Sequence, residues 1–379
     1  MAWTLQGFYV VWLPLNVAVV WSQFRGREDA SLMTAKAASV LIAALQLGAI
    51  GGATLSGALV DSLPLWLVLL IPGLVVLACT FAVAFGLESD ASRADGALDF
   101  LGVVLLSIAL VAFTGGLSMI RLNGAGSLIA WVLVALGVGL LVPFVRHERR
   151  YPDPLIDVRL LRSSTLAPVF LTASLIGVSV LGAQAPLATF LRTDPREAGY
   201  GLGASGFIAS SLIGGYLLAM SVGALLFPRF ARRFTPQIAL VGASCLVGLG
   251  YLMFLPLHER YLQVLVNLAI VGLGAGALTA ALPAAAAAAA PQHQTGMATG
   301  LTNSTKTIGG AMASAVFGIV LVRGTSEASG GAGSYAGYLT IWMVCGVTAL
   351  VGATVLYLVP KRAFAGHDSA SDPSTEAVL

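Results

Sequence analysis

Long apolar runs separated by short polar segments follow one another along almost the whole chain. Each run has about 19 to 25 residues, the length that a helix needs to cross a bilayer. The runs lack the strict two-residue alternation of membrane β-strands, and a helix pairs its own backbone groups in lipid. We therefore predict an all-α fold, a polytopic transmembrane helix bundle with 11 spans, at residues 3–22, 37–60, 64–86, 98–120, 127–145, 166–190, 206–227, 237–256, 262–282, 299–322 and 337–359.

The composition agrees with this pattern. Of 379 residues, 58% are hydrophobic and only 10% are charged, so no soluble domain of useful size remains between the spans. Residues 361–379 are rich in Ser, Asp and Thr and poor in large apolar residues, which predicts a disordered tail.

Basic residues are distributed unequally between the two sets of alternating loops. One set holds fourteen Lys and Arg and the other holds five, and basic residues near span ends gather on the cytoplasmic side. We therefore expect a multi-pass protein of the cell membrane, in contact with membrane lipid, with a cytoplasmic C-terminus and, given 11 spans, an external N-terminus. The larger set comprises Arg25, Arg27, Lys36, Arg93, Arg146, Arg149, Arg150, Arg159, Arg162, Arg229, Arg232, Arg233, Lys361 and Arg362.

Four stretches carry a family resemblance: Leu5-Gln6-Gly7; the glycine-rich segment with Gly48, Gly51, Gly52 and Gly57; the segment 146–162 with its Arg-His-Glu-Arg-Arg start; and the segment with Gly296, Gly300, Asn303, Lys306, Gly309 and Gly310. In these motifs the chain resembles the 14-helix drug:proton antiporter branch of the major facilitator superfamily. The match begins at that family's fourth helix, which implies that the first three helices are absent and accounts for the external N-terminus.

The resemblance also implies a division of the chain. Residues 1–97 would be the rest of the N-terminal bundle (helices four to six of the family), 98–165 two linker helices with a basic inner loop, 166–360 a C-terminal six-helix bundle, and 361–379 the tail.

Three departures from the family pattern affect the parts linked to proton coupling. Trp3 stands where the fourth-helix motif has Arg, and Ala53 and Ser56 replace the Pro and Gly of the antiporter motif. The segment 223–234, similar to the family's gating loop, contains Arg229, Arg232 and Arg233 but no Asp.

Polar side chains within the spans are candidates for a substrate pathway, because a central charge costs about 2.5–3.5 kcal/mol and an unpaired polar group several kcal/mol. Lys306 is the one charge well inside a predicted span, with Asn303 on the same helix face. The alternative interpretation of Lys306 is that the helix starts later and the ammonium snorkels to the inner surface.

The uncharged candidates are the amides Asn16, Gln46, Gln184 and Asn267, and Gln184 stands out because Pro186 interrupts the helix hydrogen bonds beside it. These amides could equally bond only to neighbouring helices.

Glycines spaced four residues apart let two helices approach closely, either as plain packing or as a seam between moving bundles. Gly48 and Gly52, Gly272 and Gly276, and Gly296 and Gly300 have this spacing; Gly51 lies between the first two, and Gly57 follows them.

Other chemistry finds little support in the sequence. The three cysteines are far apart, the four histidines lie singly in loops or the tail, and no phosphate-binding loop occurs, so we expect no cofactor, no metal, no nucleic-acid partner and no enzyme activity. We expect a secondary transporter that exports small amphipathic or cationic compounds by alternating access, with protons as a further candidate partner. A truncated or degenerate fold with a binding role, and a metabolite facilitator of the same fold, are the alternatives.

Overall fold

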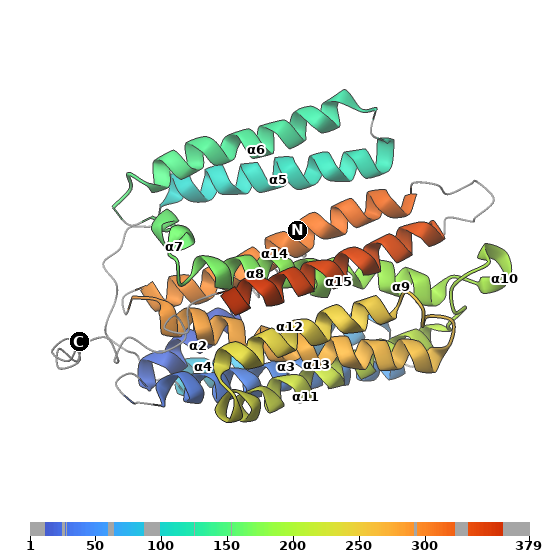
Figure 1. Ribbon diagram of the computed structural model, residues 1–379, viewed down its shortest axis with the longest axis horizontal. Coiled ribbons are helices and arrows are strands. Elements are labelled where there is room, and N and C mark those ends of the chain that lie inside the picture. The colour runs from blue at the N-terminus through green and yellow to red at the C-terminus, as the bar shows by residue number, and fades with distance from the viewer. Residues whose placement is uncertain are drawn as a thin grey trace.

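The computed structural model describes residues 12–24, 27, 29–59, 64–86, 99–124, 126–152, 154–291, 294–322 and 333–358. Regular structure within these ranges is entirely helical, which confirms the predicted fold class (Figure 1). The elements are α2 Trp12–Gln23, α3 Ala30–Leu59, α4 Leu65–Gly86, α5 Phe100–Asn123, α6 Leu128–Glu148, α7 Val158–Arg162, α8 Ala167–Gly177, the π-helical turn η2 Val178–Gly182, α9 Gln184–Arg192, α10 Pro195–Ala198, α11 Gly206–Arg233, α12 Pro236–Met253, α13 Tyr261–Ala289, α14 Thr295–Val322 and α15 Tyr335–Leu358.

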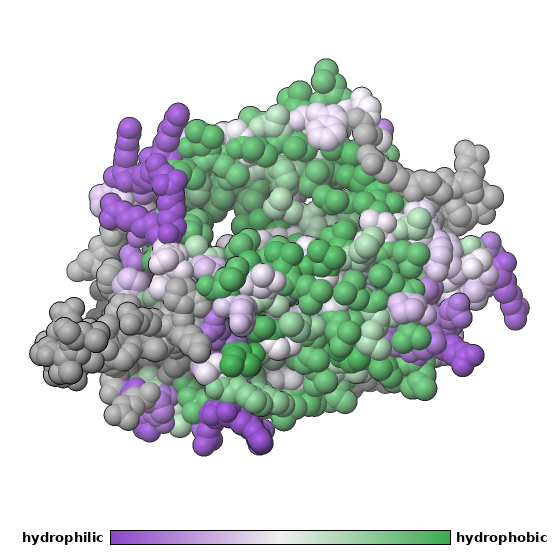
Figure 2. Space-filling view, in the orientation of Figure 1, coloured by the Kyte–Doolittle hydropathy of each residue, from purple (hydrophilic) through white to green (hydrophobic). Residues whose placement is uncertain are grey.

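The surface has the arrangement expected of a membrane protein. Apolar residues form a broad band across the middle of the view, and hydrophilic residues gather at its two ends (Figure 2). Nine helices of the described part are long and apolar enough to cross a bilayer.

The prediction of 11 spans is therefore too high for the part of the chain that the structure describes. The span predicted at 3–22 begins outside the described residues, and its described part is the short helix α2. The span predicted at 64–86 coincides with α4, but the apolar stretch recognised within it, Leu70–Ala82, is shorter than a crossing. The nine other predicted spans each correspond to a long helix.

Several helix ends differ from the prediction because polar, basic or alanine residues continue a helix beyond its most apolar part. α3 begins at Ala30 rather than at 37, and α13 continues through the alanine run to Ala289 rather than ending at 282. α11 continues to Arg233, so the predicted gating loop 223–234 is mostly helix.

The main core lies among α8 to α15, with α13 at its centre. Glycines on two sides of α13 allow neighbouring backbones to approach closely: a β-carbon on Gly276 would meet the backbone of Met220 in α11, and one on Gly274 would meet the carbonyl of Ala243 in α12. The sequence prediction of close packing at Gly272 and Gly276 is thus confirmed. In lipid, such contacts replace the hydrophobic effect as the source of helix association.

The α5–α6 hairpin lies along one side of the molecule, beside α14 (Figure 1). Gly116 and Gly137 bring its two helices into close contact, since a β-carbon on either would meet backbone atoms of the partner helix at 2.6–2.7 Å. A small cluster around Leu117, Ile120 and Ala130 packs it against α14.

The predicted span at 166–190 is a helix with an irregular centre. α8 passes into the π-helical turn η2 and then into α9. Pro186 explains the irregularity, because proline lacks the N–H that would bond to the Gly182 carbonyl and its ring clashes with that group. π-Helical turns of this kind occur frequently at functional sites.

Candidate functional site

A pocket opens between α8, α13 and α14. It has a cavity volume of about 10 Å³, room for about one water molecule, and is far smaller than the roughly 300–1,000 Å³ of a typical small-molecule site. Its lining is mostly apolar. Its polar groups are the Lys306 ammonium, the Asn303 amide and the hydroxyls of two threonines. The lining residues are Ala173, Ile176, Leu278, Thr279, Leu282, Pro283, Thr302, Asn303 and Lys306.

Lys306 and Asn303 are brought together in this pocket, on the same face of α14, as their spacing indicated. The helix begins at Thr295, earlier than predicted, so Lys306 lies about three turns inside it. The alternative of a later helix start is therefore wrong. The hydroxyls of Thr279 and Thr302 each donate to the carbonyl four residues earlier, at 2.7 and 2.8 Å, and keep an acceptor lone pair free for the pocket.

The other predicted pathway amides lie elsewhere. Gln46 Nε2 donates to the sulfur of Met220 at 3.6 Å and so links α3 to α11. Asn267 is fully buried, and its Nδ2 donates to the Leu257 carbonyl at 2.6 Å, tying the α12–α13 loop to α13. Gln184 is exposed at the first turn of α9, and Asn16 is half-buried in α2. None of the four lines the pocket, and their part in a pathway remains a prediction.

A glycine crossing adjoins the pocket. A β-carbon on Gly177 in α8 would meet the Lys306 carbonyl, and one on Gly309 in α14 would meet the Ser174 carbonyl of α8. Gly310 contacts Leu181 of the π-helical turn. The two helices therefore cross with their backbones in contact, one turn from the Lys306 side chain.

The antiporter-motif glycines have different surroundings. No described atom lies within 4 Å of a β-carbon built on Gly48, Gly51 or Gly52, and the environment of Gly57 lies outside the described residues. Their packing or gating role stays a prediction.

The three arginines of the predicted gating segment lie on the last two turns of α11. Arg229, Arg232 and Arg233 are exposed, and Arg229 donates to the Leu225 carbonyl of its own helix. The end of α11 lies at the same end of the molecule as α7, opposite α10 (Figure 1). Basic residues from two loops of the more basic set, at α7 and at the end of α11, thus lie at the same end of the bundle.

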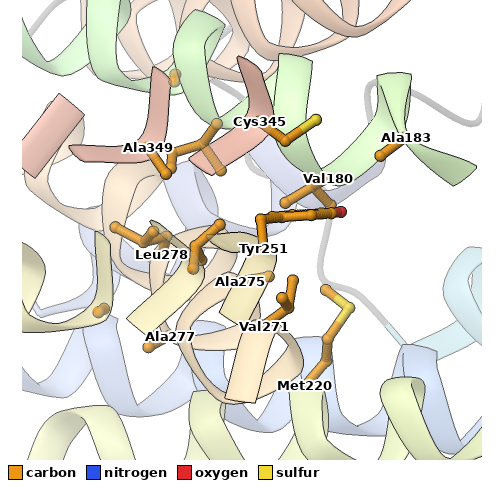
Figure 3. Close-up of a cluster of buried hydrophobic side chains, with 14 of the residues drawn as sticks. Val180, Ala183, Met220, Tyr251, Val271, Ala275, Ala277, Leu278, Cys345 and Ala349 are labelled. Atoms are coloured by element: carbon orange, nitrogen blue, oxygen red, sulfur yellow. The ribbon is translucent and has the colours of Figure 1, made fainter. Parts of the chain in front are cut away.

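A buried hydroxyl network crosses the core beside the π-helical turn. The Tyr251 hydroxyl donates to the Ser179 carbonyl, and Ser179 Oγ donates to the Cys345 carbonyl at 2.8 Å. Figure 3 shows Tyr251 among Val180, Cys345 and other apolar side chains of this core. This network could not be predicted from the sequence, because a serine and a tyrosine within apolar runs resemble ordinary span residues.

Buried polar groups at the ends of the spans were not predicted from the sequence either. Asp99 and Glu148 are almost fully buried, and His147 pairs with Asp99. His258 is buried as well, with Nδ1 2.8 Å from the Phe254 carbonyl and Nε2 2.9 Å from the Tyr335 hydroxyl. Hydropathy alone could not show this, since these residues border loops and are polar.

Comparison with known proteins adds two kinds of relatives. "Multidrug resistance protein B homolog" of Mycobacterium tuberculosis is 26% identical over 317 residues, 81% of this chain and 56% of that protein. "Quinolone resistance protein NorB" of Staphylococcus aureus is 26% identical over 269 residues, 70% of this chain and 56% of that protein. The chain thus spans just over half the length of the relatives it matches.

The sequence pattern of the Major Facilitator Superfamily matches residues 169–378. The match covers more than half of the chain and includes all three helices that line the pocket. The chain therefore belongs to the Major Facilitator Superfamily, a family of membrane transporters and not of enzymes.

Proposed function

We propose that this protein exports small amphipathic compounds by alternating access, and that the pocket between α8, α13 and α14 is part of the solute path. The observation that carries the proposal is Lys306, a charged side chain three turns inside a membrane-length helix and lining a mostly apolar pocket. A lysine at such depth is costly and generally marks a function. The relatives named for multidrug and quinolone resistance support export of drug-like solutes.

The pocket chemistry indicates which solutes fit. An apolar wall suits a hydrophobic body, while the Lys306 ammonium and the Asn303 amide suit a carboxylate, carbonyl or other acceptor. No carboxylate is present among the described lining residues to receive a cation. An amphipathic solute with an acceptor group therefore fits this pocket better than a cationic one. Because the pocket has room for only about one water molecule in this conformation, α8, α13 and α14 would have to move apart to admit a solute.

The glycine crossing of α8 and α14 supplies a place for movement. The helices are in backbone contact at Gly177 and Gly309, where neither glycine has a side chain that would resist a change in crossing angle. The adjoining π-helical turn has a shifted hydrogen-bond pattern that a small rearrangement can alter. We infer that rocking at this crossing changes access to Lys306.

Orientation and coupling are parts of the same proposal. The basic ends of α6, α7 and α11 lie at one end of the molecule, which by the positive-inside rule would be cytoplasmic and would place the C-terminus there. Proton coupling rests on the family resemblance.

The test is efflux of a panel of amphipathic dyes, anionic, neutral and cationic, from vesicles containing the protein. We expect Lys306→Ala to lower efflux of acceptor-bearing dyes by about tenfold, the scale of one lost hydrogen bond to a charged group, with unchanged protein in the membrane. Lys36→Ala, which removes a lysine near the start of α3, is the matched control and should transport normally.

Three outcomes separate the alternatives. Normal efflux by Lys306→Ala would remove the pocket from the path. Transport that ignores an imposed pH gradient would indicate a facilitator, and no transport by the unmodified chain would favour a binding or structural role.

A further inference from the structure

Three titratable side chains gather where α5 begins and α6 ends. Asp99 caps α5: its Oδ1 accepts from the Gly102 N–H at 2.8 Å and lies 2.8 Å from His147 Nε2. Glu148 is the last residue of α6, and its Oε2 accepts from the Ile156 N–H at 3.0 Å, which holds the loop before α7. Asp99 and Glu148 expose only 3% and 2% of their surface.

Each of the two carboxyl groups has a second oxygen that is buried without a hydrogen-bond donor among the described residues, Asp99 Oδ2 and Glu148 Oε1. Both oxygens face the α-carbon of Gly102, where a β-carbon would collide with them, so the missing side chain makes room for the pair. They lie within 2.5 Å of the position that this one β-carbon would occupy, so the two oxygens are close to each other. Two acceptors face each other, and a proton between them would satisfy both.

The charged side chains that the structure describes around the pair do not offer another solution. At the end of α6 and just beyond it, Arg146, Arg149 and Arg150 are exposed to solvent, and Tyr151 stacks at an angle on His147 with ring centroids 5.3 Å apart. Asp157, in the loop before α7, binds Gln294 and caps its own helix. The one charged side chain of α14, Lys306, faces the pocket with α8 and α13. The basic residues of α7 are Arg159 and Arg162, and neither forms an ion pair with Asp99 or Glu148 in the described structure.

We propose that Asp99 and Glu148 bind a single proton between them at neutral pH, and that this proton ties the start of α5 and the end of α6 to the loop before α7. Two ionised carboxylates in a buried contact repel each other strongly, so one of them keeps a proton where an exposed carboxyl would lose it. The site is distinct from the Lys306 pocket and does not rest on the proposed transport function.

Asp99 is the member of the pair that holds the negative charge. Burial acts to raise the pKa of Asp99, but the Gly102 N–H and the His147 ring together hold that pKa below its ordinary value. The positive end of the α5 helix dipole favours the same charge. The proton therefore lies on Glu148 Oε1 and is donated to Asp99 Oδ2, while Glu148 Oε2 still accepts from Ile156.

Infrared spectroscopy of the chain in lipid nanodiscs tests the proton directly. A protonated carboxyl band should be present at pH 7, where exposed carboxyl groups are ionised. Glu148→Gln should abolish it, and Glu259→Gln, which removes an exposed carboxylate from the α12–α13 loop, should leave it intact. Absence of the band, or its persistence in Glu148→Gln, would overturn the proposal.

Asp99→Asn tests whether the proton is shared. Without the neighbouring anion, Glu148 should lose its proton more readily, so the midpoint of the band should move down by about one pH unit or more. An unchanged midpoint would mean that burial alone protonates Glu148, and the shared site would be rejected.

Amide hydrogen exchange of the segment 149–157 tests the structural consequence. Above the midpoint of the infrared band, the dianionic pair should separate and release the loop. After correction for the intrinsic pH dependence of exchange, the Ile156 amide should then exchange up to about tenfold faster, the scale of one lost hydrogen bond. In Glu148→Gln the side-chain amide at position 148 donates to Asp99, and its oxygen can still accept from the Ile156 N–H. The loop should therefore stay protected at all pH values. Equal pH dependence in both proteins, or none in the unmodified chain, would contradict the tie.

Discussion

The helices α13 and α6 are both strongly apolar and of membrane length, yet they occupy opposite environments. In α13, 72% of the membrane-spanning window is buried inside the protein, whereas in α6 only 17% is buried. α6 turns Ile129, Trp131, Val132 and Val138 outward, and α13 is surrounded by α11, α12 and α14. The difference teaches that apolarity marks a membrane helix but does not decide whether the helix faces lipid or protein.

Small residues decide whether a membrane helix packs against protein or faces lipid. Gly272, Gly274 and Gly276 let α13 touch the backbones of α11 and α12, and its second half is mostly alanine. α6 makes such contacts on one face only, through Gly137, and no described atom comes near the α-carbon of Gly139 on another face. Since lipid is as apolar as leucine, close backbone contact is what favours protein neighbours over lipid.

The largest expected effect in this comparison comes from adding a side chain on α13. Gly276→Leu would place atoms in the backbone of Met220, which cannot move aside as a side chain can, and should destabilise the protein by about 3 kcal/mol or more. Gly139→Leu, on the open side of α6, should be nearly neutral. Thermal unfolding of both variants in detergent measures the contrast, and similar losses in both would show that α13 is not the tighter element.

A smaller effect is expected from the hydroxyl network in the core. Tyr251→Phe removes the donor to the Ser179 carbonyl beside the π-helical turn, at a cost of about 0.5–1.5 kcal/mol. Tyr357→Phe, at an exposed tyrosine of α15, should cost nothing measurable. A double-mutant cycle with Ser179→Ala would check whether Ser179 and Tyr251 act together, and independent losses would contradict a network.

The smallest expected effect is a local response of the α5–α6 hairpin to acid. The pKa of the Asp99 carboxyl is lowered in the folded protein. Its contribution to stability is therefore fully present when the pH is above the ordinary pKa of about 3.9, and it is lost as the pH falls through the folded pKa. As pH falls below about 4, amide exchange at the start of α5 should therefore increase, while the core of α13 stays protected. Asp99→Asn should remove this acid response, and acid sensitivity of α13 to the same degree would contradict its confinement to the hairpin.

Particular residues show how far sequence reasoning reached. Lys306 and Asn303 were predicted as pathway residues from charge and helical spacing, and both line the pocket. The opposite walls of that pocket, such as Ile176 and Leu282, have no distinguishing sequence signal, because any apolar residue of a span could lie there. Asn267, chosen for the same reason as Asn303, instead anchors a loop.

The polar residues at span ends were the least predictable. Glu148 stands within an Arg-rich segment that reads as a solvated loop, yet its carboxyl group is buried against Asp99, forty-nine positions away in the sequence. Their meeting depends on how α5 and α6 pair, which Gly116 and Gly137 bring about through contacts that hydropathy does not record.

The sequence by itself determined that the chain is a set of membrane helices and where most of them lie, because the cost of exposing backbone and polar groups to lipid acts on each segment separately. Only the tertiary structure decided which helices are enclosed, which polar groups meet, and that Lys306 borders a pocket. These outcomes depend on contacts between distant segments, and in lipid those contacts are set by the fit of backbones and small side chains rather than by apolarity.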